Sequence, residues 1–129
     1  MIQPTSGIHP EAVKGLQAFN QREFYDAHEY FEDAWRISPL EEREIYRALL
    51  QLSGGFYRLT QDRPAAARKF FDRALIWLRP FPASFKSLDV EDLRARLKAL
   101  LLALEKDLPS AEIAAQHFHP IKLPPEVKL

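Results

Sequence analysis

Residues 24–35 read FYDAHEYFEDAW, and this segment brings strong apolar anchors and unusual polar residues onto one helical surface. The apolar residues recur at helical spacing and share one stripe: Phe24, Ala27, Phe31 and Trp35. His28 and Glu32 lie one turn apart along the edge of that stripe. The segment therefore predicts an amphipathic helix that is packed on one side and carries a polar pair at the border of the core.

The composition of the whole chain limits its size class and its chemistry. With 129 residues, 47% of them hydrophobic, the chain can bury one core and leaves no room for a second ordinary domain. Eighteen basic residues balance eighteen acidic ones, so no overall field attracts nucleic acid or an anionic membrane. The lack of cysteine excludes disulfides, thiol nucleophiles and cysteine-ligated metals.

The sequence gives no indication of a membrane or of secretion. Residues 1–7, MIQPTSG, have no basic start and no apolar run, unlike a signal peptide. The longest apolar run, residues 99–104, is too short to span a bilayer. We expect a soluble, cytoplasmic protein with one helical domain over 1–129. Its core is expected at about 9–108, with a Pro-rich C-terminal tail, 109–129, packed on the body.

Helix start and stop residues divide the chain into about five helices and no strand. The expected helices cover about 10–20, 21–37, 40–61, 63–79 and 89–108, followed by a short helical turn at 110–116. Pro39 and Pro80 end two of them, because the residue before a proline disfavours helical backbone. The predicted fold class is all-α, a single-domain helical bundle with an extended C-terminal tail.

The sequence also contains a weak internal repeat of forty residues. Four pairs align at this offset: Gly15 with Gly55, Ala27 with Ala67, Phe31 with Phe71, and Ala34 with Ala74. The spacing is similar to the tetratricopeptide (TPR) pattern, although the tryptophan and tyrosine of its first helix are missing. We interpret the repeat as two TPR-like helical hairpins followed by a capping helix. Chance coincidence in a helix-rich chain is the alternative.

The polar edge of the second helix is the first candidate site. His28, Glu29 and Glu32 could ligate a divalent metal or form an acid–base pair. The spacing lacks the second histidine of the zincin motif, so it specifies no known centre. A structural histidine that pairs with Glu32 or with a carbonyl at the rim of the core explains the same residues, and we favour it. We assign no catalytic residue, metal or cofactor.

The third helix carries a polar strip between two apolar faces. Arg47 and Gln51 lie on this strip, and the amide of Gln51 is a possible partner for His28 or Glu32 because it can both donate and accept. A solvated side chain is the alternative. We expect Trp35 and Trp77 to pack in the core rather than to stack on a ligand. The candidate binding site is thus His28, Glu29, Glu32, Arg47 and Gln51.

Charge is distributed unevenly along the chain. Residues 22–47 hold eight acids against four bases, whereas residues 58–79 hold six bases against two acids. The basic stretch could touch RNA phosphates, but a solvated face or a partner for the acidic hairpin of the same or another subunit explains it equally. Because the overall charge is zero, we do not expect a nucleic-acid partner.

Several residues together resemble the DUF309 family of small bacterial and archaeal helical proteins. They are Asn20, Phe24, Ala27, His28, Glu29, Glu32 and Trp35, then Leu49 to Leu52 with Tyr57, and then Ala66, Ala67, Ala74 and Leu75. The resemblance implies an all-helical fold and an uncharacterised function, and it supplies no reaction. It would make His28, Glu29, Glu32 and Gln51 the positions to test.

The sequence leaves two kinds of function open. We favour a helical protein-binding or peptide-binding module, or a scaffold, whose hairpins present a groove to a protein partner or to a second copy in a homo-oligomer. The alternative is a metal-dependent or acid–base hydrolase-type enzyme that uses His28, Glu29 and Glu32, with Arg47 and Gln51 orienting the substrate. We expect no membrane partner.

Overall fold

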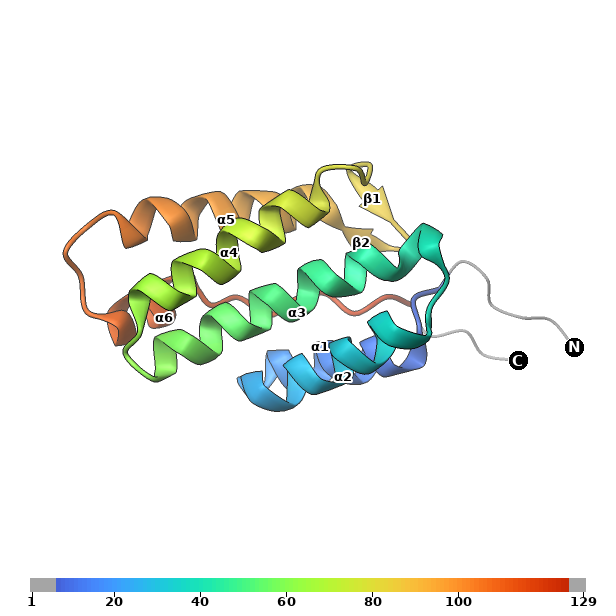
Figure 1. The fold of residues 1–129 in the computed structure, drawn as a ribbon, viewed down its shortest axis with the longest axis horizontal. Coiled ribbons are helices and arrows are strands. Elements are labelled where there is room, and N and C mark those ends of the chain that lie inside the picture. The colour runs from blue at the N-terminus through green and yellow to red at the C-terminus, as the bar shows by residue number, and fades with distance from the viewer. Residues whose placement is uncertain (1–6, 126–129) are drawn as a thin grey trace, which may run out of the picture.

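The computed structural model describes residues 7–125, which are mostly helical (Figure 1). Six helices lie in that range: α1 Pro10–Asn20, α2 Phe24–Ile37, α3 Leu40–Thr60, α4 Pro64–Leu78, α5 Val90–Leu104 and α6 Ser110–His117. Two short strands, β1 Ser84–Phe85 and β2 Leu88–Asp89, form an antiparallel hairpin between α4 and α5. The predicted helical class is therefore confirmed in outline, and the prediction of no strand is wrong.

Consecutive helices pack side by side in the order α1, α2, α3, α4, α5. In Figure 1, α3 lies between α2 and α4. The segment after α6 closes this arc, because Asn20 of α1 bonds the main chain of Ile121 and Arg96 of α5 bonds the carbonyl of Pro120. One hydrophobic cluster fills the interior and includes residues of all six helices.

The hairpin of α1 with α2 and that of α3 with α4 use the same contact, forty residues apart. A methyl group added to Gly15 would lie 2.5 Å from the ring of Phe31, and one added to Gly55 would lie 2.2 Å from the ring of Phe71. Both phenylalanines are fully buried. Each glycine therefore lets a phenylalanine of the next helix lie directly against its own helix backbone.

The turns of the two hairpins also match. Arg22 and Asp62 both have positive φ, 65° and 56°. The amide of Glu23 then donates to the carbonyl of Ala18 at 2.9 Å, and the amide of Arg63 donates to that of Arg58 at 3.0 Å. These bonds end each first helix before the next begins, which explains why α2 starts at Phe24 rather than at residue 21 as expected.

Gly54 and Gly55 together bring α3 close to α4. A methyl group on Gly54 would lie 2.8 Å from the ring of Phe70, and the next position meets Phe71 of the same helix. The two glycines thus bring α3 against two successive residues of α4. Because Phe71 is buried and Phe70 is half-exposed, the two contacts differ in how freely the ring can move.

The strand hairpin has no turn signal of the usual kind in the sequence. Lys86 and Ser87 form its turn with φ of 49° and 68°, a conformation that asparagine and glycine usually supply. The sequence prediction therefore missed it. In the part of the chain from 7 to 125, no helix is long and apolar enough to cross a membrane.

Tyr46 of α3 fixes the segment that precedes α1. Its hydroxyl donates to Glu42 Oε2 at 2.5 Å and accepts from the amide of His9 at 2.8 Å. Lys86 Nζ lies 3.6 Å from the other oxygen of Glu42 and so connects the strand hairpin to the same group. Burial, and then the hydrogen bond to Glu42, raise the pKa of Tyr46 well above its ordinary value.

Gly55→Ala should destabilise the protein by about 1–3 kcal/mol, because its methyl group would overlap the buried ring of Phe71. Gly54→Ala is the matched control, with the same gain in helix propensity but a half-exposed ring that can turn aside. Urea unfolding of both variants measures the difference. Equal free energies of unfolding would contradict the proposed role of the Gly55 contact.

The raised pKa of Tyr46 predicts a loss of stability in alkali. Because the pKa of Tyr46 is higher in the folded state than in the unfolded state, the hydroxyl makes its full contribution to the free energy of unfolding below a pH of about 10. That contribution declines as the pH rises further. Tyr46→Phe should be less stable at pH 8, and its urea midpoint should fall less steeply between pH 9 and 11. Tyr25→Phe, at an exposed tyrosine, should keep the wild-type pH dependence. Parallel curves for Tyr46→Phe and wild type would contradict this.

Candidate functional site

Four of the five candidate residues, all but Glu29, belong to a surface formed by α2, α3 and α4, which we call the outer face. On α3 the spacing of 47, 51, 54 and 58 keeps four residues on one side of the helix. The outer face comprises Tyr25, His28, Glu32 and Trp35 of α2, Arg47, Gln51, Gly54 and Arg58 of α3, and Phe70 and Trp77 of α4. Most of these side chains are only partly buried.

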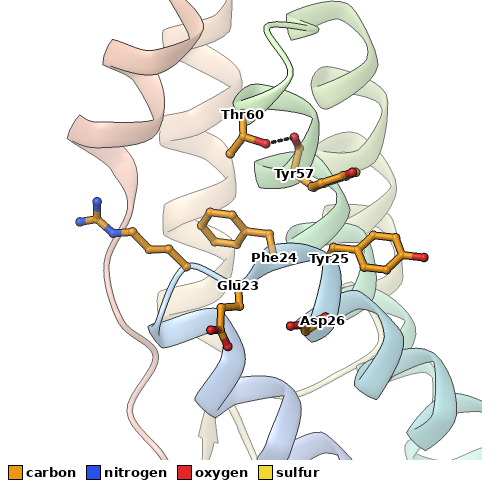
Figure 2. Close-up of a pocket in the computed structure, with 7 residues that line it drawn as sticks. Glu23, Phe24, Tyr25, Asp26, Tyr57 and Thr60 are labelled. Carbon is orange, nitrogen blue, oxygen red and sulfur yellow. Dashed lines mark hydrogen bonds between the residues drawn. The ribbon is translucent and has the colours of Figure 1, made fainter.

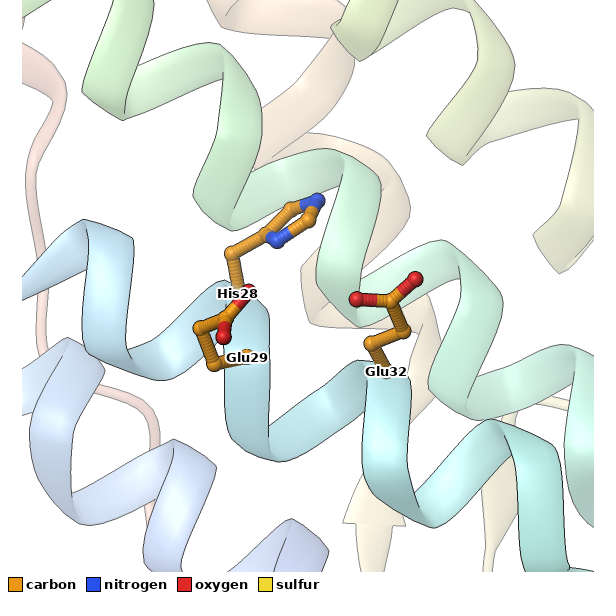
Figure 3. Close-up of side chains that lie close together, drawn as sticks. All are labelled: His28, Glu29 and Glu32. Atoms are coloured by element: carbon orange, nitrogen blue, oxygen red, sulfur yellow. The ribbon is translucent and has the colours of Figure 1, made fainter.

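The structure brings His28, Glu29 and Glu32 together. One ligand atom from each residue lies within 4.8 Å of the other two. Figure 3 shows the imidazole of His28 and the carboxylate of Glu32 extending from α2 toward α3. His28 and Glu32 are half-buried and Glu29 is exposed, so a cation held by them would keep open positions for water. A nitrogen and two carboxylate oxygens suit a borderline divalent metal.

Arg47 and Gln51 are not joined to that cluster by polar contacts. Arg47 instead lies 3.7 Å from Glu44, in the preceding turn of α3. The side-chain oxygen of Gln51 is buried and accepts no hydrogen bond from any residue between 7 and 125. The predicted pairing of Gln51 with His28 or Glu32 is therefore absent from this structure, and the unused acceptor of Gln51 is buried rather than open to a partner.

The arginine side chains of α3 stack on tryptophan rings. The guanidinium carbon of Arg47 lies 4.8 Å from the ring centroid of Trp35 and 4.2 Å from that of Trp77. Arg43 also lies over Trp35, at 4.9 Å. Arg47 thus bridges α2 and α4 across α3 by cation–π contact. The expectation that both tryptophans pack in the core is wrong in part, since each is half-buried with a face on an arginine.

A small hollow lies at the other end of the outer face. Its volume is about 80 Å³, and it is lined by Tyr25, His28, Gly54, Tyr57, Arg58 and Phe70. Tyr25 is 55% exposed, and its ring centroid lies 5.6 Å from the ring centroid of Tyr57. The guanidinium carbon of Arg58 lies 5.6 Å from the ring centroid of Phe70, and its Nη1 donates a hydrogen bond to Gln61 Oε1 at 2.7 Å. His28 therefore borders an aromatic and cationic hollow.

A second, wider hollow of about 280 Å³ adjoins the first at the turn between α1 and α2 (Figure 2). Tyr25 and Tyr57 belong to both hollows. Sequence reasoning missed these two tyrosines and Phe70 as site residues. Tyr25 directly follows the core residue Phe24 and therefore lies off the apolar stripe. That position was the one sign in the sequence that its ring would be exposed.

Most of the outer face, all but Trp77, lies in a segment that matches a known family. Residues 13–70 match the family described as "Domain of unknown function (DUF309)". The chain contains a DUF309 domain. The match runs from α1 to Phe70 of α4 and includes the cluster of His28, Glu29 and Glu32. It also includes Gly15, Phe31 and Gly55, whereas Phe71, the partner of Gly55, is the first residue beyond it.

The comparisons also give a distant relative of this chain. An uncharacterized protein of Aquifex aeolicus (strain VF5) is 30% identical to it over 99 residues, which are 74% of this chain and 30% of the relative. The chain thus spans about a third of the length of that protein. The family assignment supports the helical fold and gives no reaction.

Proposed function

We propose that this DUF309 domain is a helical protein-interaction module that binds its partner through the outer face. The observation that carries the proposal is the row of partly exposed aromatic and arginine side chains on three adjacent helices, from Tyr25 and Arg58 to Trp35, Arg47 and Trp77. Tyrosine, tryptophan and arginine are the residues most enriched at the energetic centres of interfaces.

The charges of the outer face favour a protein segment over nucleic acid. Arg47 and Arg58 are separated along the strip by the position of Gln51, and Glu32 adds a negative charge from α2. A phosphate backbone needs a surface of one sign, whereas mixed signs fit a segment with carboxylates spaced by apolar side chains.

The two matched hairpins support the finer part of this proposal, a likeness to tetratricopeptide hairpins. Stacked helical hairpins expose an extended surface on which a partner segment can lie. The equal turns and equal Gly–Phe contacts are what such stacking requires. A cytoplasmic location and a single domain over 1–129 belong to the same proposal, and a second copy of the chain is the other partner to consider.

A peptide library displayed on phage tests the proposed outer-face interaction. Selection against the wild type should enrich peptides that combine acidic and aromatic residues. Their affinity should fall at least about tenfold with Tyr25→Ala or Arg47→Ala, as expected for interface anchors. Leu102→Ala, at an exposed position of α5, is the control and should bind as the wild type does. Enriched peptides that bind all variants equally would refute the proposal.

A second function, a metal-dependent or acid–base hydrolase, is favoured by one observation. The ligand atoms of His28, Glu29 and Glu32 converge within 4.8 Å, beside a hollow that could admit a small substrate. In that case Arg47 and Gln51 would orient the substrate, and the cluster would hold the cation or move the proton.

Metal binding distinguishes this second function from the first. If it is correct, calorimetric titration with Zn²⁺ or Co²⁺ should give one site in the wild type and none in His28→Ala or Glu32→Gln. His119→Ala, at an exposed histidine, should bind as the wild type does. A wild type that binds neither ion, with a hydrolase screen that is also negative, would exclude the second function and leave His28 as a structural residue.

A further inference from the structure

The segment after α6 is held through main-chain hydrogen bonds as well as through two side chains. Asn20 Nδ2 donates to the carbonyl of Ile121 at 2.9 Å, and the amide of Ile121 donates to Asn20 Oδ1 at 2.7 Å. The guanidinium of Arg96 donates to the carbonyls of His119 and Pro120, the latter at 2.7 Å. Two side chains on two helices thus bind three consecutive peptide units, in the way that a neighbouring strand would.

Two side chains of this segment, Phe118 and Ile121, pack against the hydrophobic cluster. The ring centroid of Phe118 lies 5.4 Å from that of Phe19 and 6.0 Å from that of Phe56. The guanidinium carbon of Arg22 lies over the same ring, 4.6 Å from its centroid. Ile121 is buried to 5% exposure. The intervening residues 119 and 120, and residues 122 and 123, are exposed. The groove therefore selects an aromatic residue and, three positions later, an aliphatic one.

Residues 119–125 make no main-chain hydrogen bond to main chain within the described structure, and Phe118 has extended backbone. Their departure would break no helix and no strand. Asn20 and Arg96 contact only backbone atoms of the segment, so any extended peptide offers them the same partners. Proline is tolerated at the position of Pro120, because only its carbonyl is used.

We propose that the space between α1 and α5 is a peptide-recognition groove, and that residues 118–121 fill it as an intramolecular ligand. Its partner is an extended segment of another protein with the pattern aromatic, any residue, any residue, aliphatic. None of the groove residues Phe19, Asn20, Arg22, Phe56 and Arg96 belongs to the outer face. Arg22 also lines the wider hollow beside Tyr25, so the two surfaces adjoin, but they use different residues and either proposal can fail alone.

Residues 118–121 are covalently connected to α6, so a free peptide must compete with them for the groove. A short tether gives the chain's own segment an effective concentration on the order of millimolar, so a free peptide competes poorly until the anchors of that segment are removed. The full-length variant Phe118→Ala with Ile121→Ala removes the anchors and leaves every groove residue in place. The probe is a fluorescein-labelled peptide of residues 116–125, QHFHPIKLPP.

Fluorescence anisotropy should show that this double variant binds the probe at least about tenfold more tightly than the wild type does. Methylation of the probe's isoleucine amide removes the hydrogen bond to Asn20 Oδ1 and should weaken binding about tenfold. Adding Asn20→Ala to the double variant should weaken it at least as much. A folded double variant that does not bind the probe, or binds both probes equally, would overturn the proposal.

A second measurement uses the wild type and does not depend on the variant folding. A large excess of the unlabelled peptide should speed hydrogen exchange at the amide of Ile121, because the chain's own segment leaves the groove. The same peptide with both anchors changed to alanine should have no effect. Unchanged exchange with either peptide would overturn the proposal. The proposal would also be overturned if the protein formed concentration-dependent dimers and bound no peptide. The groove would then be occupied by the segment after α6 of a second copy.

Discussion

The contact between a glycine and a buried phenylalanine, made once in each hairpin, is the constraint on which this fold depends. Gly15 admits Phe31 and Gly55 admits Phe71, so the helices of each pair lie closer than any side chain on the glycine would allow. α3 lies between α2 and α4 (Figure 1), and Arg47, Gln51 and Arg58 on its strip are partly exposed. The outer face is a consequence of that strip.

Much of the helical framework could be predicted from sequence, because local rules decide it. Pro10 and Pro64 in the first turns, and the apolar spacing of 24–35, fix where helices run. The forty-residue repeat located the packing residues, since small and aromatic residues recur where backbones approach. The strand hairpin could not be predicted, because Lys86 and Ser87 adopt a left-handed turn that their residue types do not indicate.

The candidate site was predicted less well than the fold, for physical reasons. His28, Glu29 and Glu32 are neighbours on one helix, so spacing alone brings them together. Contacts between helices depend on side-chain directions that one sequence does not give. Arg47 therefore stacks on Trp35 and Trp77 rather than meeting the carboxylates, and Asn20 binds the main chain of Ile121 a hundred and one residues away.

We propose that this DUF309 domain binds a protein partner through the outer face. Photo-crosslinking inside the cell tests it most directly, with a photoreactive phenylalanine analogue at position 25 and, in a matched variant, at position 102, both exposed. Discrete adducts should form from position 25 and disappear when Arg58→Ala is added, and none of them should form from position 102. Identical adducts from both positions, or adducts unaffected by Arg58→Ala, would contradict it.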